Sequence, residues 1–228
     1  MLPLKDNAPT RSFPVVTVGL IAANFVVWFW ELSSRGSRIE HYAYYPCAVQ
    51  GPCIDGARDH LPVWEGAISA MFMHASWIHI LGNMLFLWIF GNNVEDVMGR
   101  LRYLAFYFAA GFVATATQTV ITLHYAPFGD ASIPNVGASG AIAGVLGAYF
   151  VLLPWASVLT LIGFFPIPVP AIFFLGLWFG LQIWEGGASL THPEQGGGVA
   201  LFAHIGGFVF GMLAVRALAV RAPLRPRW

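Results

Sequence analysis

Long runs without a charged residue dominate this 228-residue sequence and most constrain how it can fold. The first run covers residues 14–30, and its 17 residues at about 1.5 Å per residue nearly cross a hydrocarbon core of about 30 Å. Further uncharged runs cover residues 66–94, 104–127, 139–154, 167–184 and 199–215. Only 10% of the chain is charged, against about 25% in soluble domains. The sequence therefore predicts an all-α, polytopic membrane protein.

The runs predict six spans in a single membrane domain. We expect the spans at about 14–31, 70–94, 102–124, 139–154, 168–185 and 199–218. The domain then covers residues 14–220, between an N-terminal tail of residues 1–13 and a C-terminal tail of residues 221–228. Residues 157–170 are also apolar, but three prolines within five residues from Pro166 exclude a helix there. We expect that segment to lie along the membrane and lead into the fifth span.

The basic residues predict the orientation, because Lys and Arg are enriched in cytoplasmic loops. With the N-terminus inside, eight of the eleven Lys and Arg residues are cytoplasmic, namely Lys5, Arg11, Arg100, Arg102, Arg216, Arg221, Arg225 and Arg227. The other three lie in a long outer loop, residues 32–65. Both tails are therefore expected in the cytoplasm, and the short termini favour the cell membrane of a prokaryote. A formal net charge of zero argues against a nucleic-acid partner.

Polar side chains are costly inside a bilayer, so those that occur there suggest a function. His79 and Asn83 are four residues apart and project from one face of the second span. Ser139 begins the fourth span, and His204 lies early in the sixth. The remaining polar residues of the spans include Asn24, His74, Gln118 and Gln182, and for His74 we expect a hydrogen bond to the first loop.

Glycines form stripes beside two of these residues. Gly140, Gly144 and Gly147 follow Ser139 at helical spacing, and Gly207 and Gly211 lie three and seven residues after His204. Small residues at such spacing let two membrane helices approach closely. If the stripes meet, Ser139 and His204 come together as nucleophile and base. The alternative is ordinary helix packing, with His204 bonded to a carbonyl.

Three motifs in this order resemble the rhomboid family of intramembrane serine proteases. They are H-x-x-x-N at residues 79–83, G-x-S-G at residues 137–140 and A-H-x-x-G-x-x-x-G at residues 203–211. Glu95, Gly99 and Arg102 also resemble the family pattern at the cytoplasmic end of the second span. The similarity extends from Trp64 to Leu213.

The resemblance implies a role for each motif residue. Ser139 is the nucleophile, His204 is its general base, and Asn83, His79 and the Ser139 backbone N–H form the oxyanion hole. A serine at a helix N-terminus agrees with this role, because its free N–H and the helix dipole stabilise a developing oxyanion. No acidic residue lies mid-span on the second, fourth or sixth helix, so we expect a Ser–His dyad.

The predicted function is an intramembrane serine endopeptidase that cleaves transmembrane segments of other membrane proteins. We expect no metal and no organic cofactor, since H-E-x-x-H is absent. The partners are then protein substrates and the lipid bilayer, and the sequence leaves the oligomeric state open. The alternatives are a catalytically silent rhomboid-like protein that binds membrane clients, and a small transporter, which would show paired broken helices.

Two departures from the family pattern affect the expected site. Glu65 follows Trp64 where relatives often carry an arginine, which removes the loop contact of that arginine. Ala143 stands four residues after Ser139, where many relatives carry an aromatic residue that stacks on the histidine. We therefore expect His204 to be oriented by packing against Gly140 and Gly144 alone.

Cys47 and Cys53 lie in the loop assigned to the outer side of the membrane. That side is oxidising in most cells, so the sequence predicts a disulfide that tightens this loop. The alternative is a pair of free thiols.

Overall fold

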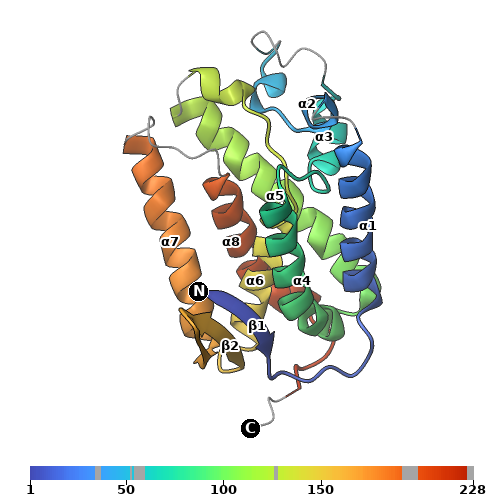
Figure 1. The fold of residues 1–228 in the computed structure, drawn as a ribbon, viewed down its shortest axis with the longest axis vertical. Helices are drawn as coiled ribbons and strands as arrows, with labels where there is room; N and C mark the ends of the chain where they lie inside the picture. Colours follow the sequence, from blue (N-terminus) through green and yellow to red (C-terminus); the bar gives the residue numbers. More distant parts are fainter. Residues whose placement is uncertain (34–36, 52, 54–59, 126–127, 192–199, 225–228) are drawn as a thin grey trace.

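The computed structural model describes the chain except for residues 34–36, 52, 54–59, 126–127, 192–199 and 225–228. Its long helices are α1 (Val15–Leu32), α4 (Trp77–Met98), α5 (Arg100–Tyr125), α6 (Ser139–Leu152), α7 (Ala171–Thr191) and α8 (Leu201–Leu218). In Figure 1, α1 and α7 stand at opposite edges of the bundle. The shorter helices are α2 (Ser37–Tyr42), η1 (Pro46–Val49), α3 (Val63–Ser69) and η2 (Phe128–Ser132).

The helices have the length and composition of a membrane bundle. Among the described residues, α1, α5, α7 and α8 are each long and apolar enough to cross a bilayer, and α6 is a shorter apolar helix. Every residue of α6 from Gly140 to Tyr149 is buried. A helix that is apolar and buried all round belongs to the interior of a large assembly of helices. The prediction of an all-α, multi-span membrane protein is confirmed.

The second long helix begins later than the sequence predicted. Residues 70–76 are not helical, and α4 starts at Trp77. Ser76 is in an extended conformation and its side chain accepts a hydrogen bond from the His79 N–H at 3.2 Å, which is typical of an N-cap. At the other end, Gly99 has φ +76°, so it ends α4 and permits the turn into α5.

A small antiparallel sheet lies at the end of the bundle opposite α2 and α3 (Figure 1). It contains β1 (Leu2–Asp6), β2 (Ser157–Ile162) and β3 (Phe165–Pro170), with β2 in the centre. The sequence predicted a membrane-lying connection at residues 157–170 and an N-terminal tail at residues 1–13, but not that these segments form a sheet. The prolines at alternate positions of β3 are compatible with an edge strand. Alternate N–H groups of a strand point to the same side, so the missing donors of these prolines all fall on the side of β3 that pairs with no other strand.

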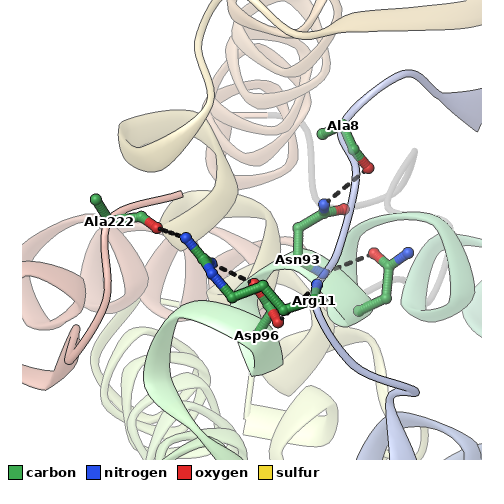
Figure 2. Close-up of polar contacts among 6 residues, drawn as sticks. Ala8, Arg11, Asn93, Asp96 and Ala222 are labelled. Atoms are coloured by element: carbon green, nitrogen blue, oxygen red, sulfur yellow. Dashed lines mark hydrogen bonds and ion pairs between the residues drawn. The ribbon is translucent and has the colours of Figure 1, made fainter. Parts of the chain in front are cut away.

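Two acidic residues near the end of α4 fasten the N-terminal segment to the bundle. The Glu95 carboxylate accepts hydrogen bonds from the N–H groups of Val16 and Thr17, at 3.0 and 2.8 Å, and so caps α1. Asp96 pairs with Arg11 at 2.6 Å, and the same guanidinium donates to the Ala222 carbonyl (Figure 2). The Glu95 position of the family pattern therefore has a structural function in this chain.

Candidate active site

Ser139 is the first residue of α6 and follows a turn that hydrogen bonds hold in place. The Gly137 N–H donates to the Ala70 carbonyl at 2.8 Å, and Tyr44 and Asn135 form an isolated β-bridge beside it. The first N–H groups of an α-helix have no partner within the helix. The Ser139 N–H is therefore oriented like the donors of an oxyanion hole, at the positive end of the helix dipole.

Gly137 brings this turn against the polar face of α4. Its φ of +123° is a conformation that favours glycine. A Cβ added there would lie 2.7 Å from the Nε2 of His79 and 3.7 Å from the Nδ2 of Asn83. The His79 and Asn83 side chains thus lie next to the segment that leads into Ser139.

The structure brings Ser139 and His204 together. Ser139 Oγ lies 2.8 Å from His204 Nε2, across the contact between α6 and α8. The two glycine stripes make that contact, since a Cβ on Gly207 or Gly211 would overlap the carbonyl oxygen of Gly140 or Gly144. The close approach of the fourth and sixth spans expected from the glycine spacing is present in the structure.

The orientation of His204 differs from the expectation. Its Nδ1 lies 2.6 Å from Oε1 of Gln182 on α7, and the Trp178 ring is tilted 38° to the imidazole at a centroid distance of 5.8 Å. Packing against Gly140 and Gly144 alone is therefore not what holds this ring. The sequence contained one signal for this contact, namely the amide of Gln182 in an apolar span. The position of Gln182 in the sequence does not indicate which helix its side chain faces.

His74 lies next to Asn83. Its Nδ1 is 3.1 Å from the Phe72 carbonyl, and its Nε2 is 3.0 Å from the Nδ2 of Asn83. The expected bond from the His74 side chain to the first loop is replaced by this bond to Asn83. An amide NH₂ has two hydrogens, so Asn83 keeps one donor for another acceptor.

One pocket of about 250 Å³ lies between α4, α6, α7 and α8. Ser139, His204, His79 and Asn83 supply its polar groups, and apolar residues of α4, α6 and α7 complete the wall. Ala143 lines this pocket with a methyl group only. Within the described part of the chain, no group of three or more His, Cys, Asp or Glu side chains could hold a metal ion.

The cysteines of the first loop lie apart from this pocket. Cys47 and Cys53 form a disulfide, with their Cα atoms 5.3 Å apart. Cys53 belongs to a small cluster with Ala43 and Tyr45, against which Val136 packs. The disulfide therefore stabilises the part of the loop next to the turn that carries Gly137.

Comparison with known proteins identifies relatives over about two thirds of this chain. Among them are Rhomboid protein 1, mitochondrial, of Saccharomyces cerevisiae, with 28% identity over 158 residues, and the bovine Presenilin-associated rhomboid-like protein, mitochondrial, with 29% identity over 137 residues. Rhomboid protease GluP of Bacillus subtilis is 30% identical over 159 residues. These matches cover 68%, 60% and 69% of this chain, but only 42%, 32% and 26% of the respective relatives.

The mitochondrial relatives conflict with the expectation of a prokaryotic source, which rested on the short termini. Residues 62–221 match the family model described as the Rhomboid domain, which is more than half of the chain. The motif order, the helical membrane bundle and this match agree. The chain belongs to the rhomboid family.

Proposed function

We propose that this chain is an intramembrane serine endopeptidase that cleaves transmembrane segments of other membrane proteins. The observation that carries the proposal is the 2.8 Å contact between Ser139 Oγ and His204 Nε2. That contact lies in a pocket that also contains His79 and Asn83, the expected oxyanion donors. The name of one relative, a rhomboid protease, agrees with this function.

The spatial arrangement of these groups supports the steps of peptide-bond hydrolysis. His204 Nε2 takes the Ser139 hydroxyl proton while Oγ attacks the carbonyl carbon of the scissile peptide bond. The carbonyl oxygen becomes an oxyanion, which the Ser139 N–H, the free Asn83 donor and His79 stabilise. His204 then gives the proton to the leaving amine, and the acyl-enzyme forms. A water molecule, activated by the same imidazole, hydrolyses that ester and restores Ser139.

The short central helix fits a substrate that lies in the membrane. The 14 residues of α6 span about 21 Å at 1.5 Å per residue, against a hydrocarbon thickness of about 30 Å. Ser139 therefore lies below the membrane surface that is nearer to α2 and α3. A transmembrane helix must unwind to offer a peptide bond there, because a helical carbonyl is already hydrogen-bonded.

The proposed orientation places both termini on the side of the membrane rich in Lys and Arg, in agreement with the positive-inside pattern. The disulfide and the first loop then lie on the opposite side, which is the side from which water reaches Ser139. Among the described residues, this arrangement puts the sheet and the Arg11–Asp96 pair at the inner end of the bundle.

Labelling with a fluorophosphonate probe tests the proposal and separates it from a catalytically silent rhomboid-like protein. The wild-type protein should react covalently and cleave a model transmembrane substrate in detergent or liposomes, whereas Ser139→Ala should do neither. Ser189→Ala is the matched control, because that hydroxyl donates to the Gly186 carbonyl of its own helix and does not line the pocket of Ser139. A wild-type protein that is folded yet neither labelled nor active would refute the protease function.

A further inference from the structure

Gln182 on α7 contacts the imidazole of His204 at the nitrogen that does not face Ser139. Its Oε1 lies 2.6 Å from His204 Nδ1, and only 9% of the residue is exposed. We propose that Gln182 is a positioning residue that fixes the orientation and the tautomer of His204. The proposal rests on the protease function and adds a third side chain to the Ser139–His204 pair.

The direction of this hydrogen bond decides which nitrogen of His204 carries the proton. An amide oxygen only accepts hydrogen bonds, so Oε1 requires an N–H group at Nδ1. Nε2 is then unprotonated, and its lone pair is available to the Ser139 hydroxyl at 2.8 Å. With the other tautomer, Nε2 would carry the proton and could not act as the base. In serine proteases, loss of control over the tautomer costs about 10⁴ in kcat.

Aromatic contacts keep Gln182 within reach of His204. Trp178 lies one turn before Gln182 on the same face of α7, and its ring centroid is 5.8 Å from that of His204 and 6.0 Å from that of Phe208. Phe179 stacks on Phe208 at 4.3 Å. These contacts fasten α7 to α8 next to His204.

α7 provides the support for the His204 ring that Ala143 on α6 cannot provide. An aromatic side chain at that position of α6 would cover one face of the imidazole, but the buried methyl group of Ala143 leaves pocket volume there. In this chain the aromatic cover and the hydrogen-bond acceptor both come from α7. Proton transfer by His204 therefore depends on α7 as well as on α6 and α8.

The first test measures the tautomer of His204 directly and does not depend on protease activity. Nitrogen-15 histidine NMR is recorded on detergent-solubilised Ser139→Ala protein, because without the serine hydroxyl neither tautomer of His204 is favoured by residue 139. The His204 signals are assigned by their loss when His204→Ala is added. We expect the Nδ1–H tautomer in this protein. Adding Gln182→Met, which keeps the length of the side chain and removes the amide, should shift His204 to a mixture rich in the Nε2–H tautomer.

The second test measures turnover with Ser139 present. Gln182→Met should lower kcat by about 10² or more with KM nearly unchanged, since general-base catalysis contributes about 10²–10⁴. Gln182→Glu should restore most of kcat, because a carboxylate also accepts the Nδ1 proton, and it should move the acidic limb of the pH–rate profile to higher pH. Leu181→Met, at a neighbouring exposed position of α7, is the control and should change neither quantity.

The outcomes separate this proposal from the proposed function. An unchanged His204 tautomer in Gln182→Met, or a folded Gln182→Met protein with full kcat, would overturn the positioning role. A Gln182→Glu variant as inactive as Gln182→Met would also overturn it, since both variants keep the packing volume. A wild-type protein without activity would instead refute the protease function, and the NMR comparison would still show whether Gln182 controls His204.

Discussion

Gly211→Ala should separate α8 from α6 and so lengthen the contact between Ser139 and His204. A Cβ at Gly211 would overlap the Gly144 carbonyl oxygen and lie 2.7 Å from its carbon and 3.0 Å from the Ala148 nitrogen. Ordinary van der Waals contacts of a Cβ are 3.4–4 Å, and the obstructing atoms belong to backbone that cannot turn aside. The two helices must therefore separate by about 1 Å at this point.

The expected magnitude follows from that displacement. A shift of about 1 Å carried along α8 would extend the Ser139–His204 distance from 2.8 Å to a length at which no hydrogen bond forms. A misplacement of this size costs about 10² in rate. Overpacking costs a further 1–3 kcal/mol, roughly, in the free energy of unfolding. Gly211→Leu should be worse in both respects.

The assay compares cleavage of a model transmembrane substrate with thermal unfolding in the same detergent. Gly19→Ala on α1 is the matched control, because nothing lies within 4 Å of a Cβ at that position. It should keep full activity and equal or higher stability, since alanine is the better helix former. If Gly211→Ala retained both turnover and melting temperature, the argument that the glycine contact sets the site geometry would be wrong.

Three further predictions concern other parts of the molecule. At equal folding, His204→Ala should abolish cleavage as Ser139→Ala does, whereas Asn83→Ala should retain about 10⁻² to 10⁻³ of the rate because other oxyanion donors remain. Alkylation of protein kept oxidising should leave the first-loop cysteines unlabelled until a reductant is added; full labelling without reductant would contradict the disulfide. Burial raises the pKa of Asp6 to about 6, so the folded state binds more protons than the unfolded state between about pH 4 and 6, and stability should fall as pH rises through that range. Asp6→Asn should flatten that part of the profile of melting temperature against pH.

Much of the site could be predicted because short spacings encode it. His79 and Asn83 share a face of α4 because they are four residues apart, and the glycine stripes predict a close helix pair without any knowledge of the rest of the fold. Gln182 could not be assigned in the same way. Its partner His204 is 22 residues away on another helix, and hydropathy in a fully apolar span does not indicate which face meets which neighbour.

The sheet was missed for a related reason. β1 pairs with β2 across about 155 residues of sequence, and the short β1 segment, which contains Lys5 and Asp6, does not indicate its partner. The apolar composition of β2 is equally compatible with membrane-embedded chain. The alternate prolines of β3 correctly excluded a helix, but an edge strand and an irregular connection both satisfy that exclusion. Only the pairing of β3 with β2 distinguishes the two.

The late start of α4 connects the fold to the chemistry. In a helix that ran through residues 70–76, the His74 N–H would bond to the Ala70 carbonyl. In the structure the His74 N–H instead contacts the Glu31 carboxylate at 3.2 Å, and the Ala70 carbonyl accepts the Gly137 N–H at 2.8 Å. The same non-helical turn places the His74 ring 3.0 Å from the Asn83 amide. A regular span over these residues would thus remove an anchor of the turn that leads into Ser139, and it would also remove the partner of Asn83.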